Sequence, residues 1–308
     1  MKSSIKLSAL NLPVLYSLFT TFLLISASSL SGQSSKISQS SQKLPVAWEE
    51  LTSSDFSLAV KQSEGVCIIP IGVIEKHGQH LPMGTDVFTS RYISLAAAAK
   101  EYAVVFPFYY AGQIFEAMHQ PGTIAYSEEL LYKILEETCA EISRNGIKKI
   151  LLVNGHGGNV YFLQYFCQTM LAKERDFSVY LFSPSVDADT QKKIASMRKT
   201  TTGGHADEGE SSTMLVVRPD LVKMERASIE SGADQKRLQL PDAYSSIGWY
   251  SKYPNHYAGD AKDATGELGE IILNQRIKQL SEVIKTIKDD KAAMQLQREF
   301  WDKTSHSK

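Results

Sequence analysis

Cysteine is scarce in this chain of 308 residues, which contains only Cys67, Cys139 and Cys167. A small, odd number excludes the disulfide framework that holds many small secreted domains together. Each cysteine lies in an apolar segment, so we expect the three to be small hydrophobic groups of the core. None stands in a pattern typical of a catalytic nucleophile.

An excess of charge of one sign is also absent. Lysine and arginine together number 33 and aspartate and glutamate 34, which gives a net charge of −1. This balance argues against a nucleic acid or an anionic membrane as a partner. The hydrophobic share of 43% is ordinary for a globular protein, and neither a repeat nor an internal boundary interrupts the sequence after residue 45. We therefore expect one domain over residues 45–308.

A long apolar run does occur at the N-terminus. Lys2 and Lys6 precede the apolar residues 12–27, and small residues follow as far as Gly32. This order predicts a secretory signal peptide over residues 1–31, because the run is short for a membrane span. We expect a polar, disordered lead-in over residues 32–44, export to the periplasm or the medium, and no membrane attachment after cleavage. An uncleaved N-terminal anchor is the alternative.

Apolar strands and amphipathic helices alternate along the rest of the chain. Continuous apolar runs predict buried strands at Val66–Ile71, 103–110, 149–153 and 178–183. Helical patterns cover residues 90–100, 128–146, 160–173, 213–217 and 265–289, and Ser127 is expected to cap the second. Such alternation predicts an α/β fold with a mostly parallel sheet and helices on both faces.

Carboxylate and imidazole side chains follow two of these strands. Glu75, His77 and Asp86 come after the first, and His156 lies in N-G-H-G-G-N after the third. Functional loops of parallel sheets lie at the carboxyl ends of the strands. Imidazole and carboxylate are ligands of zinc, manganese and iron. Surface histidines on a polar loop are one alternative, and a phosphate-binding turn is another, although the glycine pattern matches neither common phosphate motif.

A third polar cluster precedes an apolar helical segment and contains His205, Asp207, Glu208 and Glu210. Taken alone, it is explained by the preference of helix N-termini for acidic residues. Three such clusters at loops of one α/β chain favour a metal centre instead.

These segments closely resemble the signature blocks of the creatininase (creatinine amidohydrolase) family. The matching stretches are residues 70–86 (P-I-G-V-I-E-K-H-G-Q-H-L-P-M-G-T-D), 154–159 (N-G-H-G-G-N) and 205–222 (H-A-D-E-G-E-S-S-T-M-L-V-V-R-P-D-L-V). The resemblance covers residues 45 to 285. It implies a three-layer αβα sandwich, a homo-oligomer that is often a hexamer, two divalent metal ions per chain, and hydrolysis of an amide-type C–N bond in a small molecule.

The resemblance also implies roles for single residues. Glu75 and His156 resemble ligands of one metal, His77 resembles a ligand of the other, and Asp86 resembles the carboxylate that bridges them. His205 resembles the family's catalytic histidine, which transfers protons. His80 resembles a structural histidine.

The chain departs from creatininase at two places. Gly158 stands where that enzyme has a metal-binding glutamate, and we expect Glu208 to take the vacated place, with Glu210 as the second choice. Residues 200–202 are threonines where creatininase has a tryptophan that stacks on creatinine, which argues against creatinine itself. We expect no metal role for the remaining histidines, His119, His256 and His306, although the first two could approach the pocket.

The prediction from the sequence is therefore an exported amidohydrolase with two divalent ions, zinc before manganese or iron. Cleavage of a short or modified peptide is the alternative within the enzyme class. A binding protein without catalytic activity is the alternative from another class, and a lost metal ligand would be its sign.

Overall fold

The computed structural model describes residues 44–184 and 186–306. The predicted signal peptide, and the predicted lead-in up to residue 43, lie outside these residues. Within the described ranges no helix combines the length and the apolar character needed to cross a membrane. Leu44 already packs against the core of the domain.

A parallel sheet of four strands, in the order β2-β1-β3-β4, forms the centre of the domain. Its strands are β1 (Val66–Ile71), β2 (Val104–Val105), β3 (Lys149–Asn154) and β4 (Ser178–Phe182). Every residue of β1 is buried, as expected for a strand covered on both faces. The register pairs Ile71 of β1 with Asn154 of β3, so these two strands end at the same level of the sheet.

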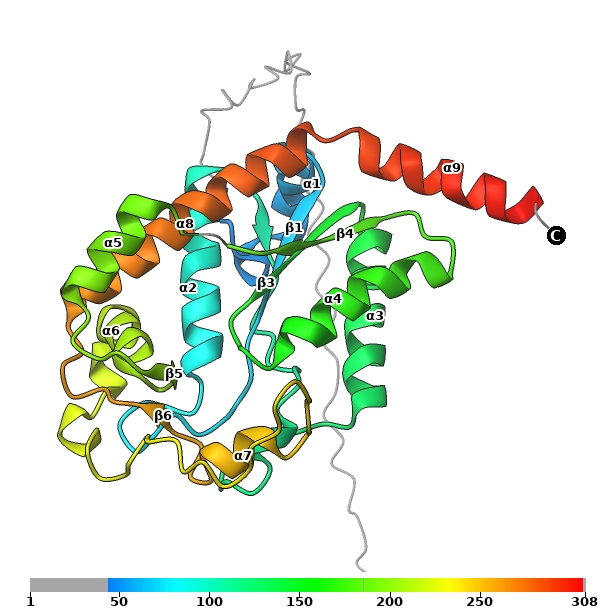
Figure 1. Ribbon diagram of the computed structural model, residues 1–308. Coiled ribbons are helices and arrows are strands. Elements are labelled where there is room, and N and C mark those ends of the chain that lie inside the picture. Colours follow the sequence, from blue (N-terminus) through cyan, green and yellow to red (C-terminus); the bar gives the residue numbers. More distant parts are fainter. Residues whose placement is uncertain (1–43, 185, 307–308) are drawn as a thin grey trace, which may run out of the picture. The chain divides into compact units, whose positions relative to one another are not determined.

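Helices cover both faces of this sheet (Figure 1). The α-helices are α1 (Ser53–Gln62), α2 (Thr85–Lys100), α3 (Glu128–Arg144), α4 (Asn159–Thr169), α5 (Ala188–Met197), α6 (Glu208–Val217), α7 (Gly248–Lys252), α8 (Gly266–Asp289) and α9 (Ala292–His306). Short 3-10 helices are η1 (Trp48–Glu50), η2 (Phe115–Ala117), η3 (Met170–Ala172), η4 (Pro219–Leu221) and η5 (Met224–Arg226).

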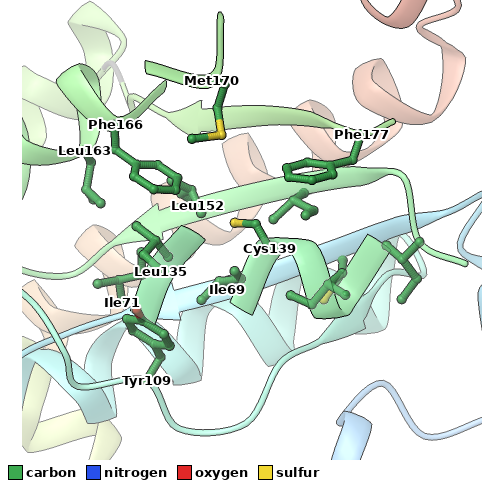
Figure 2. Packing of buried hydrophobic residues seen from close by; sticks show 14 of the residues in the cluster. Ile69, Ile71, Tyr109, Leu135, Cys139, Leu152, Leu163, Phe166, Met170 and Phe177 are labelled. Carbon is green, nitrogen blue, oxygen red and sulfur yellow. The ribbon is translucent and has the colours of Figure 1, made fainter. Parts of the chain in front are cut away.

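The two faces of β1 belong to two separate hydrophobic clusters. Cys67, Ile69 and Ile71 pack with residues of α1, α3 and α4 (Figure 2), whereas Val66 and Ile68 pack with residues of α2 and α8. Alternation of neighbouring side chains between the faces follows from the period of two in a strand. The predicted three-layer αβα architecture is confirmed.

Most of the predicted elements are present, with altered ends. Ser127 caps α3 by accepting a hydrogen bond from the Leu130 N–H, as predicted. The predicted strand over 103–110 is wrong beyond β2, because Pro107 cannot donate a ladder hydrogen bond and only an isolated bridge, Ile71 with Tyr109, follows. The helix predicted over 213–217 begins five residues earlier, at the start of α6.

A second, small sheet was not predicted. Strand β5 (Gly203–His205) pairs antiparallel with β6 (Ala258–Gly259), and Gly232 forms a further bridge with Gly259. A Cβ atom on Gly232 would stand 2.1 Å from the carbonyl oxygen of Gly259, so the two backbones can approach this closely only because residue 232 is glycine. In Figure 1, β5, β6 and α7 gather near the end of the sheet to which β1 leads.

Candidate metal centre

The chain that leaves β1 passes directly against the start of α2. A Cβ on Gly72 would lie 2.5 Å from the Val87 nitrogen and 2.7 Å from the carbonyl carbon of Asp86. Glycine at this position therefore lets the segment that carries Glu75 and His77 reach the first turn of α2, where Asp86 lies. The neighbouring strand β3 delivers His156 to the same place.

The two carboxylate oxygens of Asp86 face two different histidines. Asp86 Oδ1 lies 3.1 Å from His77 Nε2, and Oδ2 lies 3.1 Å from His156 Nδ1. Asp86 is 3% exposed, so both contacts are buried. A carboxylate between two imidazoles in this way has the arrangement that a bridging ligand requires.

Glu75 lies beside the same pair of histidines. Its Oε1 is 2.8 Å from His156 Nδ1 and 3.8 Å from His77 Nε2. Glu75, His77 and Asp86 form one of the groups whose ligand atoms all lie within 4.8 Å of one another. The structure thus brings together four of the five predicted ligands.

The charges of the cluster depend strongly on one another. Burial alone would lower the pKa of His77, but Asp86 and Glu75 outweigh it and raise the pKa to about 10. Against burial, the same carboxylates hold the pKa of His156 well above its ordinary value. Burial opposes ionisation of Glu75, yet attraction to His156, His205 and His77 keeps its pKa well below the ordinary value. The protein thus keeps the buried carboxylate of Glu75 ionised by placing imidazole rings beside it.

Several buried polar atoms at the cluster have no hydrogen-bond partner among the described residues. They include Glu75 Oε1 and Asp86 Oδ2, although both oxygens point at His156. Burying a carboxylate oxygen without a partner is unfavourable unless a cation compensates it. Carboxylate oxygens and imidazole nitrogens are ligands that zinc and manganese accept. The two oxygens and His156 Nδ1, which both of them approach, therefore fit a divalent ion.

His205 reaches the cluster from β5. Its Nε2 lies 2.7 Å from the Lys76 carbonyl oxygen, which can only accept, so Nε2 is the protonated nitrogen. Nδ1 is then the acceptor, 4.0 Å from Glu210 Oε2. Burial and the neighbouring His77 hold the pKa of His205 well below its ordinary value, so the ring is neutral near pH 7.

Glu208 does not reach the cluster, which corrects the ligand prediction. Its carboxylate accepts hydrogen bonds from the backbone N–H groups of Lys199 and Thr200 and from the Thr200 hydroxyl, at 2.6–3.1 Å. Residues two apart on a helix point about 200° apart around its axis, so Glu208 and Glu210 cannot face the same site.

Glu210 faces the cluster instead. Its Oε2 lies 3.8 Å from His77 Nε2, and it forms a candidate ligand group with His77 and His205. Its side chain is 37% exposed, toward the cavity. Desolvation raises the pKa of Glu210 to about 7, against the opposing attraction of His77. The second choice from the sequence is therefore the carboxylate that the structure places at the site.

The space above Gly158 is filled by other side chains. A Cβ on Gly158 would lie 2.5 Å from His156 Nε2, 2.6 Å from Gln113 Oε1 and 2.7 Å from Glu116 Oε1. Gln113 Nε2 donates to the other oxygen of Glu116, at 2.8 Å. A larger side chain at position 158 would displace this pair. Gly158 therefore does more than lack a ligand side chain, because its small size leaves room for Glu116 Oε1 to lie 4.0 Å from His156 Nε2.

His256, which the sequence allowed to approach the pocket, lies at the cluster itself. Its Nε2 lies 2.5 Å from Glu75 Oε2, and the ring is 1% exposed. A lone histidine in an irregular segment has no diagnostic spacing, so the sequence contains little that would single it out. His80 is buried against Ser211, and His119 lies on the cavity wall, 2.8 Å from the Pro254 carbonyl.

The cluster opens into a cavity of about 1460 Å³. His156, His205, Glu210 and His256 line its base. The walls come from η2 and the residues after it, from the turn before α4, and from residues 234–252. Several large apolar side chains of this wall are exposed, among them Phe115, Met118, Tyr161, Leu240, Tyr244 and Ile247.

Comparison with known proteins identifies the family. The family model for creatininase, described as creatinine amidohydrolase, matches residues 49–284. Creatinine amidohydrolase of Pseudomonas putida is 26% identical over 263 residues, which cover 77% of this chain and 95% of that protein. Mycofactocin precursor peptide peptidase of Mycolicibacterium smegmatis is 27% identical over 231 residues, which cover 73% of this chain and 86% of that protein.

The fold is shared with solved structures as well. A structure described as manganese creatininase superposes with a TM-score of 0.68 at 23% sequence identity. The match covers 80% of this chain and all of that one.

Proposed function

The chain belongs to the creatininase family, and we propose that it is a metal-dependent hydrolase that cleaves an amide-type C–N bond in a small molecule. The observation that carries the proposal is Asp86, whose two oxygens face His77 and His156. Two divalent ions are proposed, with zinc as the first choice since imidazole and carboxylate ligands suit it.

The ligand atoms divide into two sets that share Asp86. Glu75, His156 and Oδ2 of Asp86 would hold one ion. His77, Glu210 and Oδ1 of Asp86 would hold the other. Ions held in these positions would lower the pKa of water and polarise a substrate carbonyl, which would make hydrolysis possible near neutral pH.

His205 is proposed to move the protons. Lys76 holds Nε2–H, which leaves Nδ1 as a base that faces the cavity beside Glu210. A neutral imidazole at this position can take a proton and pass it to the departing nitrogen, which is a poor leaving group until it is protonated.

Cleavage of a peptide is the second candidate, and the cavity favours it. Pockets for small ligands occupy about 300–1,000 Å³, whereas this cavity measures about 1460 Å³. Its exposed apolar wall would suit side chains on either side of a scissile bond better than it suits a small polar ring. A panel of cyclic amides, N-acyl amines and short peptides separates the two candidates by relative kcat/KM.

Metal analysis of an Asp86→Asn variant tests the proposed centre. We expect loss of both ions and of turnover, because one shared carboxylate neutralises and positions the pair. Asp176→Asn is the matched control, since Asp176 pairs with Lys148 and Ser143 away from the site. An Asp86→Asn protein that kept two ions and normal turnover would reject the shared ligand. Metal bound without turnover of any substrate would favour a binding protein.

A His205→Asn variant tests the proton transfer. We expect the metal content to be unchanged and turnover to fall by roughly 10²–10⁴-fold, the usual effect of losing a general acid–base group. Asp176→Asn, away from the site, is again the control. Loss of metal in proportion to activity would instead make His205 a ligand.

Export and self-association also remain predictions. The basic and apolar pattern of residues 1–31 supports a signal peptide, and N-terminal sequencing of protein from its host tests it. A mature chain that starts at Met1 would reject export. Light scattering of the purified protein tests the homo-oligomer that the family resemblance implies.

A further inference from the structure

His256 connects the wall of the cavity to a proposed metal ligand. The indole N–H of Trp249, in α7, donates to His256 Nδ1 at 2.9 Å. On the other side of the ring, His256 Nε2 lies 2.5 Å from Glu75 Oε2. Trp249 lines the cavity, whereas Glu75 is fully buried. A continuous chain of side-chain hydrogen bonds therefore runs from the cavity surface to the cluster.

The tryptophan determines where the His256 ring holds its proton. An indole N–H can only donate a hydrogen bond, so Nδ1 of His256 must present its lone pair. The single proton of the neutral ring is then on Nε2. That N–H points at Glu75 Oε2, and an ionised carboxylate can only accept. Both contacts are satisfied together by one tautomer alone.

This tautomer is incompatible with metal binding through Nε2. His256, Glu75 and His205 place ligand atoms within 4.8 Å of one another, and distance alone would make His256 a candidate ligand. A histidine that binds a metal through Nε2 presents a lone pair there and holds its proton on Nδ1. That proton would face the Trp249 N–H, two donors at 2.9 Å with no acceptor between them.

We propose that His256 is a positioning residue, locked by Trp249 as a donor to Glu75 Oε2, and that it aims Glu75 Oε1 at the metal site. The inference rests on the metal centre proposed above. Metal-binding carboxylates and histidines commonly depend on such outer hydrogen bonds, whose loss weakens metal affinity by about 10–100-fold.

The backbone at His256 supports a dedicated role. Its φ of +56° lies in the left-handed region, which is uncommon for a residue other than glycine. The His256 N–H donates to the Tyr253 carbonyl at 2.9 Å, and Ala258, two residues on, pairs with His205 in the small sheet. Surrounding contacts therefore hold the strained conformation, which delivers the ring to Glu75.

Three variants separate a positioning residue from a ligand. In His256→Gln the side-chain oxygen can accept from Trp249 and the amide N–H can donate to Glu75, which reproduces the proposed polarity, although an amide is a poor zinc ligand. His256→Leu removes both bonds. Trp249→Phe keeps an aromatic wall but removes the donor that sets the tautomer.

Zinc affinity, measured by chelator competition, is the first readout. We expect His256→Leu to lose about 10–100-fold, His256→Gln to recover most of that loss, and all variants to bind the same number of ions at saturating zinc. If His256→Gln were as weak as His256→Leu and one ion per chain were missing, His256 would be a ligand and the proposal would be wrong.

The second readout does not depend on any metal. Nitrogen-15 NMR of the metal-free protein, with the His256 signals assigned by their loss in His256→Gln, reports which ring nitrogen is protonated. We expect Nε2–H alone in the unmodified protein, and protonation of Nδ1 as well in Trp249→Phe, because Glu75 still accepts from Nε2–H while Nδ1 no longer faces a donor. A proton on Nδ1 in the unmodified protein would overturn the proposal. Failure of the protein to bind zinc would reject the metal centre while leaving this test of the tautomer intact.

Discussion

Loading the metal-free protein with zinc should release protons from the cluster. The pKa of His77 is raised to about 10 and that of His156 lies well above its ordinary value, because Asp86 and Glu75 overcome the effect of burial. The His77 ring therefore carries two N–H protons at pH 8, and the raised pKa of His156 favours the same form of that ring. A metal ligand must present a lone pair, so each ring has to lose one proton when an ion binds.

The expected release at pH 8 is about one proton per chain from His77, with a further contribution from His156. Glu210, with a pKa of about 7, is already ionised at that pH and adds little. Each released proton makes the apparent affinity rise about tenfold per pH unit, and the rise continues until the pH passes the pKa of the ring in the metal-free protein. Rising pH therefore strengthens zinc binding over the whole range from 6.5 to 8.

Rising pH has the opposite effect on the stability of the metal-free protein, because the pKa of His77 is raised. A raised histidine pKa stabilises the fold fully below the unfolded value of about 6.5, and this stabilisation disappears as the pH rises through about 10. We expect the melting temperature of the metal-free protein to fall between pH 7 and 10, and that of the zinc-loaded protein to change less.

Calorimetry in two buffers of different ionisation enthalpy counts the released protons. His156→Gln should reduce the count, whereas His119→Gln, whose ring lies on the cavity wall, should leave it unchanged. Zinc binding without proton release, together with an affinity that is flat from pH 6.5 to 8, would refute the assignment of these histidines as protonated ligands.

Two further predictions concern the carboxylates and the glycine turn. Glu210→Gln should lower zinc affinity about tenfold or more. Glu208→Gln should retain zinc and lose about 1–3 kcal/mol of stability, because the Glu208 carboxylate accepts hydrogen bonds from the backbone of residues 199–200. Zinc content and melting curves check both variants, and the reverse order would return the ligand role to Glu208. Gly158→Ala should weaken zinc binding and turnover, because the new Cβ would stand 2.5 Å from His156 Nε2. Gly157→Ala is the matched control, since a Cβ there meets nothing within 4 Å. Equal zinc affinities of the two variants would contradict the prediction.

The central sheet and most of the cluster could be predicted from the sequence. The run Val66–Ile71 matches β1 residue for residue, because complete burial leaves an uninterrupted apolar signal. Parallel strands that end at one edge then bring Glu75, His77 and His156 together without any knowledge of side-chain geometry. These predictions succeeded because they depend on topology, which a sequence pattern reveals.

Predictions that depend on the direction in which a single side chain points were less accurate. The choice between Glu208 and Glu210 depends on where α6 begins and how its first turn is rotated, and a motif does not specify either. The sequence allowed His256 to approach the pocket but did not place it beside Glu75, because its position is fixed by the small sheet and by a left-handed backbone, both of which arise from contacts distant in the sequence.

The contact between Gly232 and Gly259 bears on how the substrate range of such an enzyme can diversify. It clamps one end of residues 233–247, while α7 and the Trp249–His256 hydrogen bond fix the other end. The stretch between them supplies Leu238, Leu240 and Tyr244 to the cavity wall but no residue to the cluster. Insertions and substitutions in this stretch can therefore change which substrates fit the cavity without altering the residues of the cluster.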